Sequence, residues 1–91
     1  MSDSDHDILG RIEEYRGRID ELDQEIVRML NLRAEFALAI RELKPAVSQS
    51  LYDPKREQDI FEKLREANEG PLFDDNLRAV YEVVLQVMKE L

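Results

Sequence analysis

Hydrophobic positions in the first half of the chain recur in alternating steps of four and three residues. Ten of the eleven members of this apolar seam are apolar: Ile8, Ile12, Tyr15, Ile19, Leu22, Ile26, Met29, Arg33, Phe36, Ile40 and Leu43. The heptad spacing predicts one long helix from about Asp7 to Lys44. Pro45 ends it, because proline cannot continue a helix and disfavours helical geometry in the residue before it.

Two shorter helices are expected after a loop from Ala46 to Tyr52. Asp53 offers an N-cap and Pro54 occupies the favoured first helical position. The apolar face of this second helix comprises Ile60, Phe61, Leu64 and Ala67, and Gly70-Pro71 stops it. A third helix is expected from Asp74 or Asp75 to the last residue, with apolar positions Leu77, Val80, Tyr81, Val84, Val87, Met88 and Leu91.

The length of the first helix bears on assembly. At 1.5 Å per residue it is about 55 Å long, whereas a compact chain of this size is only about 30 Å across. Because an uncovered apolar seam of that length is unfavourable in water, we expect an all-α fold of three helices, one very long, that forms an intertwined homodimer or a larger helical assembly. Residues 1–7 are interpreted as a disordered acidic tail and residues 8–91 as one domain.

Composition narrows the classes of function. Cysteine is absent and the only histidine, His6, lies in the opening segment, so thiol nucleophiles, imidazole catalysis and most transition-metal sites have little support. The net charge of −8 argues against binding to nucleic acid or to an anionic membrane. The first residues lack the basic and apolar regions of a signal peptide, and we expect a cytoplasmic protein.

Arg33 is the charged exception in the apolar seam. A guanidinium on an apolar face is unfavourable unless an anion meets it, although an internal pair with a glutamate or a side chain that reaches solvent would also satisfy it. Lys44 lies eleven residues later and therefore within about 20° of Arg33 on the same helix face. By itself, a lysine in a last turn is explained by the helix dipole.

Arg56 is unusual because the first turn of a helix prefers negative charge. Asp53 could pair with Arg56 across the cap, which would make this an ordinary helix start. Alternatively, several cations that converge in an apolar pocket could hold a small dicarboxylate and stabilise charge separation in a transition state, without a covalent step.

These residues stand in motifs that together resemble the all-helical chorismate mutase family of bacteria. The run IEEYRGRIDELDQEIVRMLNLRAEFALAIRELK contains Arg16, the Ile-Asp-x-x-Asp motif at 19–23, the Leu-x-x-Arg motif ending at Arg33, and Lys44. YDPKRE then supplies Asp53, Arg56 and Glu57. The resemblance covers Ile8 to Leu91, and NEGPLFDDNLRAVYEVV is similar to chorismate mutase domains fused ahead of prephenate dehydratase.

The resemblance implies an isomerase that converts chorismate to prephenate, on the way to phenylalanine and tyrosine, without cofactor or metal. It implies that Arg16 and Arg33 bind the two carboxylates of chorismate and that Lys44 donates to its ether oxygen. Glu57 would accept from the ring hydroxyl. It further implies that Asp53 and Arg56 support the loop and the carboxylate side of the pocket, with Ile40 in the apolar wall.

Spacing adds a constraint on this site. Arg16 and Arg33 are 17 residues apart, which is about 25 Å along one straight helix. They cannot share a small ligand within one chain, so Arg16 must come from the partner subunit of a homodimer.

Two features depart from the family pattern. The family places a second partner of the ether oxygen, Gln or Glu, at a position that falls just beyond Leu91. We therefore expect either the front part of a longer bifunctional enzyme or a mutase that lacks this contact, since Gln86 and Glu90 face other directions. Pro45 could also shift Lys44. The alternative functions are an isochorismate pyruvate lyase-like enzyme and a non-catalytic helical dimerisation or regulatory module.

Overall fold

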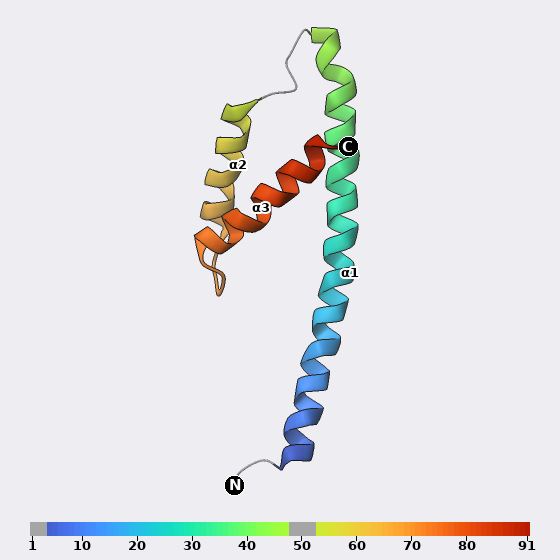
Figure 1. The fold of residues 1–91 in the computed structure, drawn as a ribbon, viewed down its shortest axis with the longest axis vertical. Coiled ribbons are helices and arrows are strands. Elements are labelled where there is room, and N and C mark those ends of the chain that lie inside the picture. The colour runs from blue at the N-terminus through green and yellow to red at the C-terminus, as the bar shows by residue number, and fades with distance from the viewer. Residues whose placement is uncertain (1–3, 48–52) are drawn as a thin grey trace. The chain divides into compact units, whose positions relative to one another are not determined.

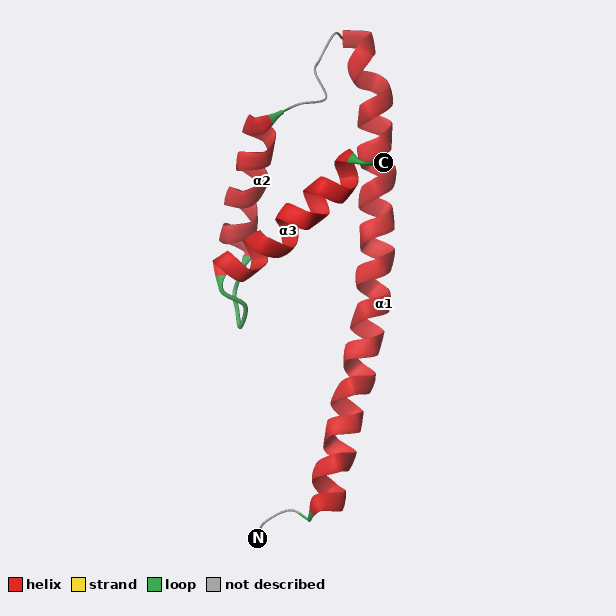
Figure 2. Ribbon diagram, viewed as in Figure 1, coloured by secondary structure: helices red, strands yellow, loops and turns green. Residues whose placement is uncertain are grey.

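The computed structural model describes residues 4–47 and 53–91 (Figure 1). All regular structure within these residues is helical (Figure 2). The elements are α1 (Asp5–Leu43), the short 3-10 helix η1 (Lys44–Val47), α2 (Pro54–Ala67) and α3 (Asp74–Lys89). The expected all-α class, with one very long helix and two shorter ones, is confirmed. No helix in the described part of the chain is long and apolar enough to cross a membrane.

α1 begins earlier than the sequence pattern indicated. Asp5 to Asp7, which we expected within a disordered tail, are helical, and residues 1–3 lie outside the described part. Ser4 explains the start, because its Oγ accepts a hydrogen bond from the backbone N–H of Asp7 at 3.2 Å. Asp5 and Asp7 also place negative charge in the first turn, where the helix dipole favours it.

The other end of α1 lies close to the predicted position. The α-helix ends at Leu43, one residue before the expected Lys44, and Lys44 opens η1. Pro45 accounts for this change, since it disfavours α-helical geometry in the residue that precedes it. Ala46 and Val47, which we expected in a loop, belong to η1, and residues 48–52 of that expected loop lie outside the described residues.

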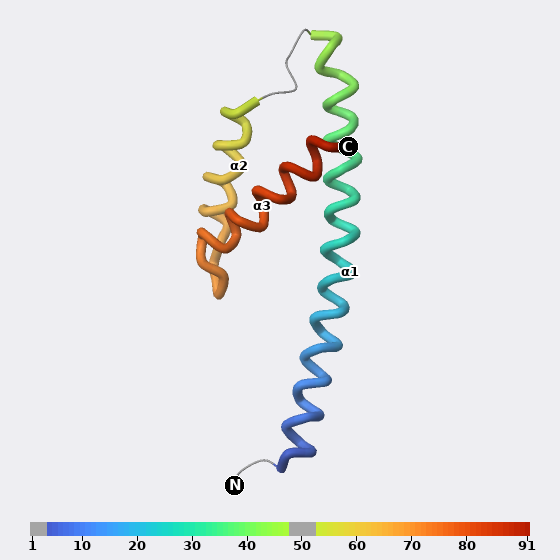
Figure 3. Tube along the Cα trace, in the orientation of Figure 1, coloured from blue at the N-terminus to red at the C-terminus, as the bar shows by residue number. Residues whose placement is uncertain are grey.

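The chain divides into two compact units, residues 1–33 and residues 34–91. The described part of the first unit is a stretch of α1 traced from blue to cyan in Figure 3. Its large apolar side chains have exposed fractions between 37% and 61%. They are Ile8, Leu9, Ile12, Tyr15, Ile19, Leu22, Ile26, Val27, Met29, Leu30 and Leu32. Within this unit the apolar seam is therefore uncovered.

In the second unit, α2 and α3 contact each other (Figure 1). Leu85 of α3 is the one buried residue among the described residues, with 8% of its surface exposed. The half-buried apolar side chains of α2 and α3 are Ile60, Phe61, Leu64, Leu77, Tyr81, Val84 and Met88. Leu85 is absent from the predicted apolar face, whereas Val80, Val87 and Leu91 of that face are exposed.

Asn68 organises the connection between α2 and α3. Its side-chain N–H groups donate to the Leu72 carbonyl at 2.9 Å and to Asp74 Oδ1 at 2.8 Å. Its Oδ1 accepts from the Gly70 N–H at 3.1 Å. Gly70 has a φ of 78°, a backbone conformation that residues other than glycine rarely adopt. α2 therefore ends at Ala67, three residues before the Gly70-Pro71 pair that the sequence indicated as its stop.

Candidate active site

Arg16 and Arg33 both belong to the first unit and lie on α1. Arg16 is exposed, and its Nη1 is 2.8 Å from Glu13 Oε1, one turn away on the helix surface. A surface ion pair of this kind contributes little free energy, so it does not prevent Arg16 from binding an anion. The 17 residues that separate the two arginines correspond to about 25 Å of helix.

Arg33 is half-buried. Within residues 4–33 its side chain makes no hydrogen bond or ion pair, and the pair with a glutamate that would make it a purely structural residue does not form there. The guanidinium thus has N–H donors that no group within residues 4–33 accepts.

Ile40 and Lys44 belong to the second unit. Ile40 lies in the last part of α1 with 54% of its surface exposed, as an apolar wall for a ligand requires. Lys44 is half-buried at the start of η1 rather than in the last turn of α1. The predicted ether-oxygen donor therefore sits at the junction that Pro45 creates.

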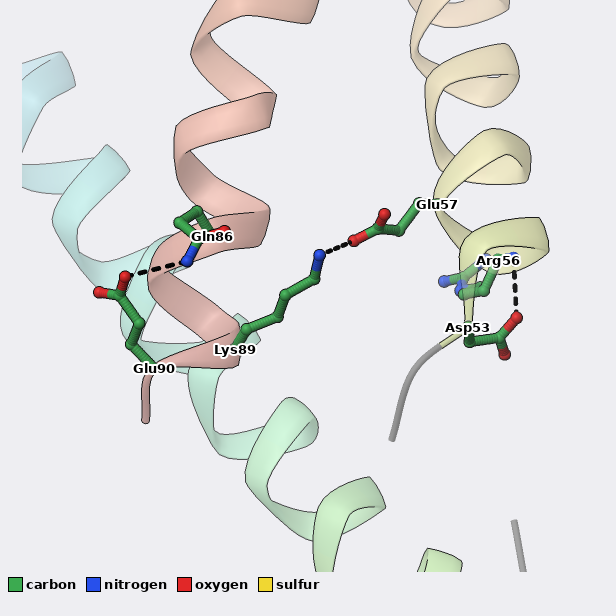
Figure 4. A network of polar contacts seen from close by, with 6 residues as sticks. All are labelled: Asp53, Arg56, Glu57, Gln86, Lys89 and Glu90. Atoms are coloured by element: carbon green, nitrogen blue, oxygen red, sulfur yellow. Dashed lines mark hydrogen bonds and ion pairs between the residues drawn. The ribbon is translucent and has the colours of Figure 1, made fainter. Parts of the chain in front are cut away.

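The start of α2 contains three predicted site residues (Figure 4). Asp53 is its N-cap, and its Oδ1 accepts a hydrogen bond from the backbone N–H of Arg56 at 3.0 Å. Asp53 thus meets the backbone of Arg56, and this bond fixes the first turn of α2. Glu57 follows in the same turn, where its charge suits the helix dipole.

Glu57 makes a contact that the sequence did not reveal. Its Oε1 lies 2.5 Å from Nζ of Lys89, at the end of α3 (Figure 4). Arg41 of α1 in turn donates from Nη2 to the Lys89 carbonyl at 3.0 Å and from Nη1 to the Leu91 carbonyl. Arg41 and Lys89 each lie in the last turn of a helix, where the helix dipole favours a basic residue. No sequence signal therefore distinguished them from ordinary surface residues.

Gln86 and Glu90 bind each other instead of approaching Glu57. Gln86 Nε2 donates to Glu90 Oε1 at 3.0 Å (Figure 4). These two side chains, which we expected to face away from the site, are thus paired with each other at the end of α3.

A pocket lies between α2 and α3. Its volume is about 250 Å³, and its lining includes Phe61, Glu62, Arg65, Asp74 and Arg78. The Arg78 guanidinium lies over the Phe61 ring, 4.1 Å from the centroid. None of the predicted site residues lines this pocket.

In residues 4–47 and 53–91, no group of three or more His, Cys, Asp or Glu side chains is arranged to hold a metal ion.

Comparison with protein families identifies residues 15–91 with the family described as chorismate mutase type II. The bifunctional chorismate mutase/prephenate dehydratase of Neisseria gonorrhoeae is 38% identical over 71 residues, which are 78% of this chain. The match spans only 19% of that relative's length. The chorismate mutase of Methanocaldococcus jannaschii is 25% identical over 85 residues, covering 92% of this chain and 86% of the relative.

A solved structure agrees with these matches. The structure of chorismate mutase (form II) from Thermus thermophilus superposes with a TM-score of 0.86 and 30% sequence identity. It covers 89% of this chain and 92% of the Thermus chain. The similarity therefore extends over nearly the whole of both chains.

Proposed function

The chain belongs to the chorismate mutase type II family, and from this premise we propose that it converts chorismate to prephenate in phenylalanine and tyrosine biosynthesis. The observation that carries the proposal is the extent of the family match. Residues 15–91 include all seven predicted site residues, which are Arg16, Arg33, Ile40, Lys44, Asp53, Arg56 and Glu57.

The proposed reaction is a rearrangement within one molecule. The ether C–O bond breaks while a new C–C bond forms, and no group leaves or enters. The enzyme therefore has two tasks: it must hold the flexible dianion in a compact conformation, and it must stabilise the negative charge that develops on the ether oxygen. Neither task needs a nucleophile, and the chain contains no cysteine and only one histidine, His6.

The positive side chains are suited to both tasks. Arg33 and Arg16 hold the two carboxylates, because guanidinium groups bind carboxylates with paired hydrogen bonds. Lys44 donates to the ether oxygen, where its charge stabilises the transition state more than the ground state. Glu57 accepts from the ring hydroxyl, and Ile40 forms part of the apolar wall.

Asp53 and Arg56 complete the proposed site. The Asp53 carboxylate caps α2 and so holds the backbone of the first turn, to which Arg56 and Glu57 belong, in helical geometry. In this arrangement Arg56 supports the carboxylate side of the pocket.

We further propose a homodimer in which each site takes Arg16 from the partner subunit. Two observations within the first unit support this arrangement. The helix separates Arg16 from Arg33 by about 25 Å, too far to hold one small dicarboxylate. The apolar seam of the same unit is also uncovered, and burying it against a second copy would remove the apolar surface from water.

The test is to assay the purified chain for conversion of chorismate to prephenate and to determine its mass by light scattering on the same sample. We expect turnover by a dimer. Isochorismate serves as the comparison substrate, and preferential release of pyruvate from it would assign the lyase reaction instead. A folded dimer that turns over neither substrate would contradict an enzymatic function.

A further inference from the structure

Side chains and carbonyls from three helices meet in the second unit, near the start of α2. Glu57 is in the first turn of α2, Lys89 is the last residue of α3, and Arg41 is near the end of α1. The ion pair between Lys89 Nζ and Glu57 Oε1 links α3 to α2, and the Arg41 bonds to the Lys89 and Leu91 carbonyls link α1 to α3. By contrast, four ion pairs connect positions three or four residues apart on one helix, namely Arg16–Glu13, Arg18–Glu14, Arg28–Glu25 and Arg78–Glu82.

We propose that Lys89 is a positioning residue, which holds the carboxylate of Glu57 in place to accept the ring hydroxyl of the substrate. This inference rests on the proposed function, because it assigns Glu57 to that hydroxyl. It adds a residue that the family motifs in the sequence do not include. Arg41 acts one step further away, by fixing the end of α3 that carries Lys89.

The geometry of the carboxylate allows both contacts at once. Lys89 engages Oε1 of Glu57, and Oε2 is the second acceptor of the same group. Glu57 has 30% of its side chain exposed and lies on a helix surface, where a glutamate without a partner samples several rotamers. A charge-assisted bond to Lys89 restricts those rotamers before the substrate binds, which lowers the cost of ordering Glu57 in the complex.

Arg41 is suited to hold the end of α3. The last carbonyls of an α-helix have no partners within the helix, and they carry partial negative charge. Arg41 is half-buried, and its guanidinium donates to two of the carbonyls in this region. The backbone of Lys89 is thereby tied to α1 while its side chain reaches α2.

The experiment is a double-mutant cycle on kcat/KM with Lys89→Met, Glu57→Ala and the double variant, in the full chain. Lys89→Met is expected to lower kcat/KM about tenfold, the effect of losing one charge-assisted hydrogen bond. In the Glu57→Ala background the same substitution should change kcat/KM less than twofold, because the carboxylate that Lys89 positions is gone. Lys89→Arg should recover most of the loss.

Lys63→Met is the matched control, since Lys63 is an exposed lysine of α2 outside the proposed site. It should leave kcat/KM unchanged. Circular dichroism and light scattering on each variant restrict the comparison to folded protein of the same assembly. If Lys89→Met lowers kcat/KM equally with and without Glu57, the positioning role is wrong while the proposed function stands. If the unsubstituted chain does not turn over chorismate, the proposed function itself fails.

Discussion

Arg33 is the one charged residue among the eleven positions of the apolar seam. Its neighbours in the heptad pattern are Met29 and Phe36, so association along the seam would place the guanidinium beside apolar groups. Within residues 4–33 no carboxylate pairs with the Arg33 guanidinium. A substrate carboxylate would provide the missing partner, which is the physical reason for assigning Arg33 to binding rather than to stability.

At this scale, Arg33→Ala is predicted to lower kcat/KM at least about 100-fold, because truncating one partner of a desolvated charge pair costs several kcal/mol. The dimer should persist, since alanine suits an apolar seam. Arg28→Ala is the control, because Arg28 is exposed on the same helix and pairs with Glu25 one turn away. The assay is chorismate turnover, with light scattering for the assembly. A folded Arg33→Ala dimer with full activity would refute the assignment.

Single residues also mark where sequence reasoning reaches its limit. The spacing along the first helix indicated Arg33 and Lys44, and the family motifs indicated Glu57. Both kinds of signal depend only on residue types and their separations in the sequence. The Lys89–Glu57 pair depends on how α2 and α3 pack, which no local pattern specifies. Lys89 therefore resembled any lysine in a last helical turn.

The elements themselves follow from local chemistry. Serine, proline and aspartate determine both ends of α1 and the start of α2 to within one or two residues of the expected positions, whereas α2 ends three residues before its expected stop. The apolar face of α3 was less predictable. Val84 and Leu85 are adjacent in sequence, and packing against the rest of the second unit buries Leu85 while Val80 and Val87 stay exposed. Helical periodicity alone does not choose among such neighbouring positions.

The cap of α2 gives a prediction for this scale. Asp53→Ala removes the acceptor for the Arg56 N–H and should lower the free energy of unfolding by about 1 kcal/mol. Asp53→Asn keeps a side-chain oxygen at the cap and should retain most of the stability. Urea unfolding at one fixed protein concentration measures both variants. Equal destabilisation by Ala and Asn would show that the carboxylate acts through its charge and not as a cap.

At the scale of the whole molecule, the account depends on a second copy of the chain. The first unit of one chain exposes its apolar side chains and separates two arginines that the proposed site must bring together. A homodimer resolves both problems if Arg16 of one subunit and Arg33 of the other share a substrate. In such a dimer, two symmetric sites each depend on both chains.

Mixing two inactive variants tests this claim most directly. Arg16→Ala and Arg33→Ala chains are unfolded, combined in equal amounts and refolded, and chorismate turnover is measured. With random pairing, half the dimers contain one chain of each kind, and each has one site with both arginines intact. The account predicts recovery of about a quarter of the unsubstituted activity. No recovery, in a sample where mass spectrometry confirms mixed dimers, would contradict a site shared between subunits.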